Sequence, residues 1–139
     1  MKMSEYKFKV SDGTGIQVYE WLPENPENIQ RVVQISHGMA EHCGRYKDFA
    51  YFLTQHNTAV YAHDHRGHGK TAGKIENVGY LAKRNGWEKM VQDMKEISTH
   101  IKEKYKDQPL YLFGHSMGSF VVRNVLVKPG IKIEVAILS

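Results

Sequence analysis

The sequence has 139 residues, of which 41% are hydrophobic and 24% charged, and its formal net charge is +4. This length suits one domain, and the composition is typical of a globular protein rather than a disordered or membrane-spanning one. The lysines form no basic run interleaved with aromatic residues, so we expect no nucleic-acid partner, and the modest positive charge favours at most a peripheral contact with lipid. Cys43 is the only cysteine, which excludes an internal disulfide and favours a reducing, cytoplasmic setting.

The N-terminal residues predict a β-hairpin. Residues 6–11 and 16–22 alternate between polar and apolar side chains around the turn sequence Asp12-Gly13-Thr14-Gly15. Residues 23–28 (PENPEN) then predict a loop, because proline and asparagine interrupt regular structure there.

Short apolar runs alternate with helical patterns over the rest of the chain. The runs have the composition of strands buried on both faces of a parallel sheet: they are Arg31–Ser36, Thr58–Ala62, Leu110–Phe113 and Val135–Leu138. Apolar residues at three- and four-residue spacing, or the demands of a tight turn, predict helices between them: these cover residues 46–53, 87–105 and 117–127.

This order of elements predicts an α/β protein, with a mostly parallel sheet, flanking helices and an antiparallel N-terminal edge. Ligands of such sheets bind beyond the carboxyl ends of the parallel strands. Three segments rich in chemically active residues leave those ends: HGMAEHCGRY (37–46), HDHRGHGKTAGK (63–74) and GHSMG (114–118). We therefore expect them to converge on one edge of the sheet.

The third segment predicts a nucleophile. Gly114-His115-Ser116-Met117-Gly118 has the G-x-S-x-G pattern, with a buried strand before it and a predicted helix after it. Such a turn is pinched and needs small residues at both glycine positions. Ser116 is the predicted nucleophile, against the alternative of a tight turn that happens to contain serine.

The first segment predicts an oxyanion hole. Acyl transfer requires hydrogen-bond donors fixed around the developing oxyanion, and backbone N–H groups serve this purpose. The N–H groups of Met117 and Met39 are the candidates. The alternative is that His37-Gly38 only turns the chain and Met39 fills space in the core.

The second segment raises a metal hypothesis, because His63, His65 and His68 have the spacing H-x-H-x-x-H. Zinc hydrolases with that spacing carry an Asp before the last His, where this chain has Gly67. Successive strand residues also point to opposite faces, so the imidazoles need not converge. We predict no metal ion and no cofactor.

Together, HGMAEHCGRY, YAHDHRGHGKT and LFGHSMGS resemble the α/β-hydrolase superfamily, and more closely its monoacylglycerol lipase/lysophospholipase-like group, which includes the S33 serine aminopeptidases. The resemblance spans nearly the whole chain. It implies that Ser116 is the nucleophile, that the Met39 and Met117 amides form the oxyanion hole, and that DHRGHG is a structural loop. The implied substrates are small acyl esters such as monoglycerides or lysophospholipids.

The predicted nucleophile has no predicted base. In this fold the acid and the histidine follow the serine, yet residues 117–139 contain no His and no Asp, and Glu134 is their only acid. All eight histidines precede Ser116; His37 or His42 could approach it from the same edge of the sheet. The favoured interpretation is that residues 1–139 are the N-terminal part of one hydrolase domain, truncated after about the sixth strand, without the lid and the C-terminal strands.

Two functions follow as expectations. The first is a serine hydrolase of carboxylic esters that acts through an acyl-enzyme on Ser116, with the 139-residue chain alone inactive. The second is a non-catalytic or assembly fragment, because truncation after the sixth strand would leave a long apolar edge that can pair with another copy.

Overall fold

The computed structural model describes all 139 residues. Its strands are β1 (Lys2–Lys9), β2 (Gly15–Leu22), β3 (Arg31–Ser36), β4 (Thr58–His63), β5 (Leu110–Gly114) and β6 (Val135–Leu138). Its α-helices are α1 (Lys47–Thr54), α2 (Gly69–Ala72), α3 (Gly86–Lys104) and α4 (Met117–Leu126), and short 3₁₀ turns cover Pro26–Asn28, Cys43–Tyr46 and Ile75–Asn77.

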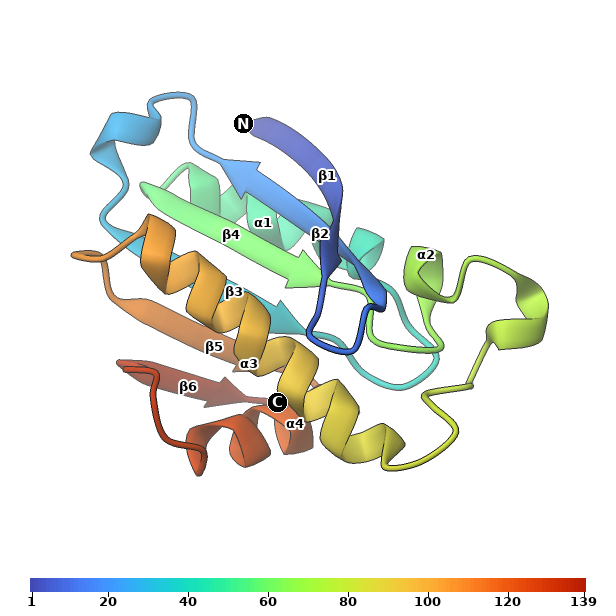
Figure 1. The fold of residues 1–139 in the computed structure, drawn as a ribbon. Helices are drawn as coiled ribbons and strands as arrows, with labels where there is room; N and C mark the ends of the chain where they lie inside the picture. Colours follow the sequence, from blue (N-terminus) through green and yellow to red (C-terminus); the bar gives the residue numbers. More distant parts are fainter.

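The six strands form one mixed sheet in the order β1-β2-β4-β3-β5-β6 (Figure 1). Strands β4, β3, β5 and β6 are parallel, and the β1–β2 hairpin adds an antiparallel edge. Ser36 pairs with Gly114, which pairs with Leu138, so β3, β5 and β6 end side by side. We call this boundary, where the parallel strands end, the carboxyl edge of the sheet. The predicted α/β class with a mostly parallel sheet is confirmed.

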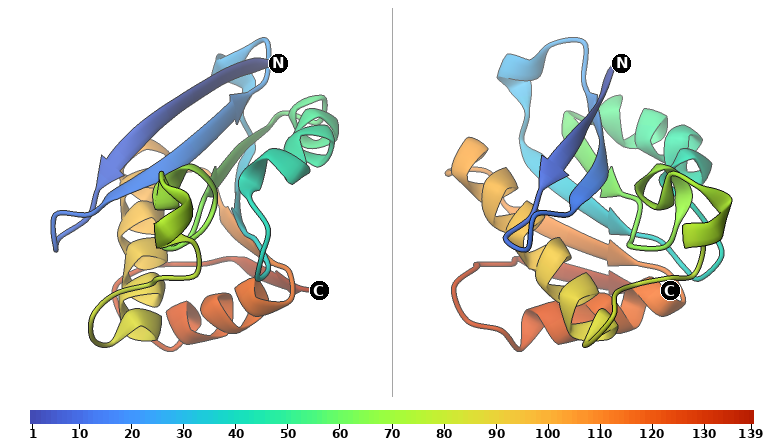
Figure 2. Two further views of the ribbon diagram at one scale, coloured as in Figure 1. Left: turned by 90° about the vertical axis from the view of Figure 1, so that its right-hand side faces the viewer. Right: turned by 45° about the vertical axis from the view of Figure 1, so that its right-hand side comes forward.

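Helices cover both faces of the sheet. Helices α3 and α4 lie on one face and α1 on the other (Figures 1 and 2). The larger core joins the stripe of α3, including Met90, Met94 and Ile97, to strand residues such as Val32 and Leu112. The smaller core packs α1 against the opposite side chains of the same strands, as the alternation of side chains along a strand requires.

The structure departs from the sequence-based expectations in three places. Strand β1 starts at Lys2 rather than at residue 6, because its whole length pairs with β2. The short α2, which no hydrophobic periodicity predicts, follows β4 after the loop of residues 64–68. The third difference concerns β6: it was expected to be buried on both faces, but Val135 and Ile137 are more than 40% exposed.

Strand β6 is the sheet's edge strand, and this position explains its exposure. Only β5 pairs with it, and no helix covers its outer face fully. The expected apolar edge is therefore present, but it is short rather than long, since β6 has four residues. No helix of the structure combines the length and the apolar character needed to cross a membrane.

Candidate active site

Ser116 lies on a sharp turn between β5 and α4, at the carboxyl edge of the sheet. Its backbone has φ 52° and ψ −120°, a region that non-glycine residues rarely occupy, and its side chain is exposed. Neighbouring strands hold the turn: the His115 N–H donates to the Ser36 carbonyl at 3.0 Å, and the Ser116 N–H donates to the Ser139 carbonyl at 2.8 Å. These hydrogen bonds therefore fix the turn in a conformation that exposes the Ser116 hydroxyl to solvent.

The two glycines of the turn are required by close approach of the backbone. A Cβ on Gly118 would lie 2.0 Å from the Ser36 carbonyl oxygen, and one on Gly114 would lie 2.6 Å from the Gly118 carbonyl oxygen. Real Cβ contacts are never this short, so α4 can begin directly against the ends of β3 and β5 only with glycine at both positions. The spacing of the G-x-S-x-G pattern thus has a direct steric cause.

The loop after β3 runs beside the serine. A Cβ on Gly38 would lie 3.2 Å from the Ser116 Cβ, which places the Gly38-Met39 backbone against the turn. The Met39 N–H donates no hydrogen bond within the chain, and its side chain is 70% exposed, so Met39 does not fill the core. The Met117 N–H opens α4, where the first N–H groups of a helix have no intrahelical acceptor. The loop that carries Met39 therefore runs beside the turn, and Met117 directly follows Ser116 in the chain.

Backbone strain is concentrated at this point. Four non-glycine residues have positive φ, and two of them are asparagines, which tolerate it well. The other two are Ala40, with φ 57°, and Ser116. Strained residues of this kind gather at functional sites, where the surrounding structure holds them.

No histidine of the chain reaches the Ser116 hydroxyl. The buried His37 ring is engaged on both sides, since Nδ1 donates to the Gly38 carbonyl at 2.7 Å and Nε2 accepts from the His65 N–H at 3.0 Å. The His42 ring lies against the backbone of Gly44. His115 points away from its neighbour, with Nδ1 3.3 Å from the Ser139 hydroxyl. His37 and His42, the candidate bases within the chain, are thus not placed to activate the serine.

Sequence reasoning missed Glu41. Its carboxylate lies 3.6 Å from His115 Nε2 and 3.4 Å from Arg45, and it accepts a hydrogen bond from the Tyr46 hydroxyl at 3.3 Å. The same group lies over Gly38, where a Cβ would come within 2.5 Å of Glu41 Oε1. Glu41 therefore links the loop after β3 to the serine turn. The signal for it was an acid followed four residues later by Arg45, as in a helical ion pair.

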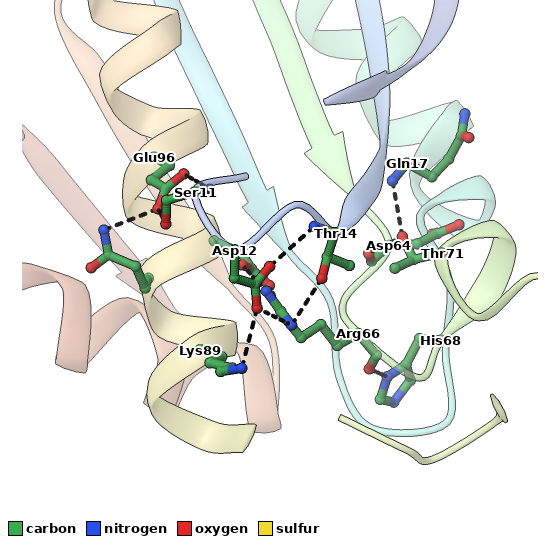
Figure 3. A network of polar contacts seen from close by, with 12 residues as sticks. Ser11, Asp12, Thr14, Gln17, Asp64, Arg66, His68, Thr71, Lys89 and Glu96 are labelled. Carbon is green, nitrogen blue, oxygen red and sulfur yellow. Dashed lines mark hydrogen bonds and ion pairs between the residues drawn. The ribbon is translucent and has the colours of Figure 1, made fainter. Parts of the chain in front are cut away.

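The loop after β4 holds a buried ion-pair network instead of a reactive group. Arg66 makes two hydrogen bonds to the Asp93 carboxylate, at 2.6 and 2.8 Å, and its third nitrogen lies 2.9 Å from Asp12 in the hairpin turn. The side chains of Arg66 and Asp93 are almost fully buried. Figure 3 shows Arg66 reaching Asp12 and Thr14, with Lys89 on the far side of Asp12. One guanidinium thus ties the hairpin to α3.

Asp93 was also missed, although it had a signal. It lies between Met90 and Ile97 on the apolar stripe of α3, where a carboxylate must be buried. Hydrogen bonding to Asp93, with a smaller contribution from Asp12, raises the pKa of the Arg66 guanidinium and keeps it charged. A buried acid on a core stripe needs a cationic partner, and Arg66 supplies it.

The histidines of the same loop pack together as buried rings rather than as a metal site. The ring centroids of His63 and His65 are 4.7 Å apart, and those of His37 and His65 are 4.3 Å apart. Burial lowers the pKa of His63 to about 3 and that of His65 well below 6.5, so both are neutral. His65 Nε2 bonds the Ser36 hydroxyl, and His68 Nδ1 donates to the Arg66 carbonyl.

The ligand-type atoms that gather within 4.8 Å belong to a different set: His37, Cys43 and Asp64. The atoms of this set that would bind a metal ion already take part in hydrogen bonds. Both Asp64 oxygens accept hydrogen bonds, from the N–H groups of Cys43 and Lys70 and from the Tyr19 hydroxyl. Burial raises the pKa of the Cys43 thiol, which disfavours the thiolate that binds metals. This set forms a structural hydrogen-bond network.

A mostly parallel sheet with a serine on a strained strand-to-helix turn and amides around it defines an α/β-hydrolase, and this chain has that fold. It belongs to the family described as serine aminopeptidase, S33, whose model matches residues 27–139. The structure of a thermostable carboxyl esterase from Bacillus coagulans, solved in complex with glycerol, superposes with a TM-score of 0.88 at 30% identity. That match covers 99% of this chain and 44% of the esterase.

Curated relatives of similar sequence are monoglyceride lipases. The chain is 33% identical to the mouse (Mus musculus) monoglyceride lipase over 111 residues, which is 80% of this chain and 34% of the lipase. It is 33% identical to the monoacylglycerol lipase of Mycolicibacterium smegmatis over 119 residues, or 86% of this chain and 40% of that protein. The chain therefore spans well under half the length of these relatives.

Proposed function

We propose that this chain carries the nucleophile and the oxyanion hole of a serine hydrolase of carboxylic esters. The observation that carries the proposal is the exposed Ser116 hydroxyl on its strained turn, with the free Met39 amide beside it. The monoglyceride lipase relatives support an ester substrate with an acyl chain, of the monoacylglycerol or lysophospholipid type.

The reaction would proceed through an acyl-enzyme. Ser116 Oγ attacks the ester carbonyl carbon and its proton passes to a general base, while the Met39 and Met117 N–H groups bind the oxyanion. The C–O bond to the alcohol then breaks, and the alcohol leaves with the proton. Water attacks the acyl-serine in the same way and releases the fatty acid and the free hydroxyl.

The base and its orienting acid belong, in this proposal, to polypeptide outside the 139 residues. The support is geometric: His37 is hydrogen-bonded through both ring nitrogens, and Nδ1 of His115 lies beside the Ser139 hydroxyl. On this basis the 139-residue chain by itself turns over little or no ester. The buried, unpaired Cys43 supports a reducing compartment such as the cytoplasm.

Ester turnover tests this proposal. Hydrolysis of a short-chain ester and of a monoacylglycerol would be measured with the product of the complete reading frame that contains these residues. Ser116→Ala should reduce kcat by about a thousandfold or more. Ser119→Ala is the matched control, since the Ser119 hydroxyl only donates to the Ser116 carbonyl, at 2.7 Å. Full activity in Ser116→Ala would refute the proposal.

A second candidate function, assembly through the sheet edge, has its own observation. The exposed side chains of β6 lie next to an apolar hollow of about 360 Å³ between α1 and the sheet, lined by Phe49, Phe52, Phe113 and Ile137 among others. A second copy pairing along β6 would cover both. Sedimentation velocity discriminates: a concentration-dependent dimer that Ile137→Lys abolishes supports assembly, and a monomer at all concentrations refutes it.

A further inference from the structure

Residues 73–80, which follow α2, form an exposed segment that the proposed chemistry does not use. All eight residues are exposed, and no strand or α-helix includes them. The segment is nevertheless held in place, since the Gly79 N–H donates to the Gly67 carbonyl at 2.8 Å and the Asn77 side chain donates to the Ala72 carbonyl at 3.0 Å. It therefore has a defined shape without being part of the core.

Three large apolar side chains of this segment face solvent. Ile75 is 86% exposed, Val78 is 65% exposed and Tyr80 is 57% exposed. The 3₁₀ turn Ile75–Asn77, closed by the Val78 N–H to the Ile75 carbonyl at 3.1 Å, places Ile75 and Val78 three residues apart. Side chains at this spacing in a 3₁₀ turn project from the same side. Single exposed apolar residues are common, but two on one side of a held turn, with the exposed Tyr80 two residues further along the chain, form a patch.

The charged residues within this segment and directly after it in the sequence are mostly positive. Lys74 lies within the segment, and Lys83 and Arg84 follow it; none of them makes an ion pair. Other lysines of this region differ, since Lys70 pairs with Glu5 and Lys89 pairs with Asp12. Glu76 is the only acid of the segment. The patch therefore combines aliphatic side chains, a tyrosine and uncompensated cations, which is the composition of interfacial segments that bind anionic lipid.

The segment lies at the carboxyl edge of the sheet, as Ser116 does. In Figures 1 and 2 it extends from α2 beyond the carboxyl end of β4, the edge at which β5 delivers the serine turn. We propose that residues 73–80 dock the protein on an anionic lipid surface, with Ile75 and Val78 inserted at the headgroup–acyl boundary and Lys74, Lys83 and Arg84 near lipid phosphates. Lipid binding by this segment would bring acyl esters of the membrane surface close to Ser116. This role in delivery rests on the proposed function, whereas lipid binding itself does not.

Vesicle binding tests the docking surface without any turnover. The 139-residue chain would be sedimented with phosphatidylcholine vesicles that contain or lack phosphatidylglycerol. We expect binding to the anionic vesicles, and a decrease of at least about tenfold in the partition coefficient for the double variant Ile75→Ser/Val78→Ser. Val127→Ser is the matched control, because Val127 is 83% exposed at the opposite end of α4. It should bind like the unchanged chain.

The variant Lys83→Glu/Arg84→Glu tests the contribution of the cations to lipid binding. It should weaken binding to anionic vesicles, and added salt should do the same. Equal binding by Ile75→Ser/Val78→Ser and the unchanged chain would overturn the proposal, and so would equal losses in Val127→Ser. The Ile75→Trp variant would be compared with the unchanged chain, which contains Trp21 and Trp87. If its additional emission changes with protein concentration in the absence of lipid, and not with vesicles, a second copy of the chain covers the patch and the lipid proposal is wrong. Hydrolysis of a soluble short-chain ester reports on the proposed function separately.

Discussion

The loops after β4 and β5 both carry residues that are common in active sites, yet the polar side chains of the first are buried and the serine of the second is exposed. The β4 loop contains histidines, Asp64 and Arg66; these side chains are buried, and both Asp64 and Arg66 are fully engaged in hydrogen bonds. The β5 loop contains Ser116, which is exposed, strained and without a hydrogen bond to its hydroxyl. Residue type therefore does not distinguish these two loops; the exposure of their side chains does.

The same comparison explains how much the sequence could predict. Hydrophobic periods and turn residues predicted all six strands and the three longer helices, because burial on a sheet leaves a direct trace in composition. The serine turn was predictable because Gly114 and Gly118 are sterically required. The role of the β4 loop could not be derived from its residues, since its partners Asp12 and Asp93 lie far away in the chain and meet Arg66 only in the fold.

Two other features lay beyond sequence reasoning. The exposure of β6 depends on which strand takes the edge of the sheet, and an apolar run looks the same at the edge and in the centre. Glu41 acts through contacts with Gly38 and His115, and the second of these is seventy-four positions away in the chain. The edge position of β6 has no local sequence signal, and the spacing of Glu41 and Arg45 predicts their ion pair but not the contacts of Glu41 with Gly38 and His115.

The largest effect on stability should come from the serine turn. Gly118→Ala places a Cβ 2.0 Å from the Ser36 carbonyl oxygen, so α4 must move away from β3. We expect a loss of more than about 4 kcal/mol in the free energy of unfolding, measured by urea denaturation. Gly15→Ala is the control, because a Cβ there meets Lys7 at an ordinary 3.6 Å. Similar urea midpoints for the two variants would show that the turn is not tightly packed.

The next effect should come from the β4 loop. Asp93→Ala leaves the Arg66 guanidinium buried beside an empty position, which costs about 3–5 kcal/mol of unfolding free energy. The surface pair Lys132–Glu134, at 2.9 Å, provides the comparison, and Glu134→Ala should lower the urea midpoint far less, because water screens this exposed pair. The contrast would fail if both variants unfolded at the same urea concentration.

A smaller, pH-dependent effect should come from the buried histidines. In the folded chain the pKa values of His37, His63 and His65 lie below the ordinary 6.5, with that of His63 at about 3, because burial disfavours the charged ring. Below pH 6.5 the unfolded chain therefore binds more protons than the folded one. Above this pH these histidines do not change the free energy of unfolding. As the pH falls from about 6.5 towards 3, their preference for protonation in the unfolded chain lowers the free energy of unfolding.

His63, with its folded pKa at about 3, should contribute a slope of about 1.4 kcal/mol per pH unit within that window. His63→Leu removes this contribution together with two ring nitrogens that have no partner. Urea midpoints measured between neutral and mildly acidic pH should then show a slope reduced by about one proton. An unchanged slope would mean that His63 takes up its proton without unfolding.

The central claim is that Ser116 is an activated nucleophile whose base lies outside these 139 residues, and a fluorophosphonate probe tests it most directly. Peptide mapping by mass spectrometry after labelling should place the adduct on Ser116 in the product of the complete reading frame. The adduct should be absent in Ser116→Ala and retained in Ser119→Ala, and the 139-residue chain should react about a thousandfold more slowly. An adduct on any other serine, or equally fast labelling of the 139-residue chain, would contradict the claim.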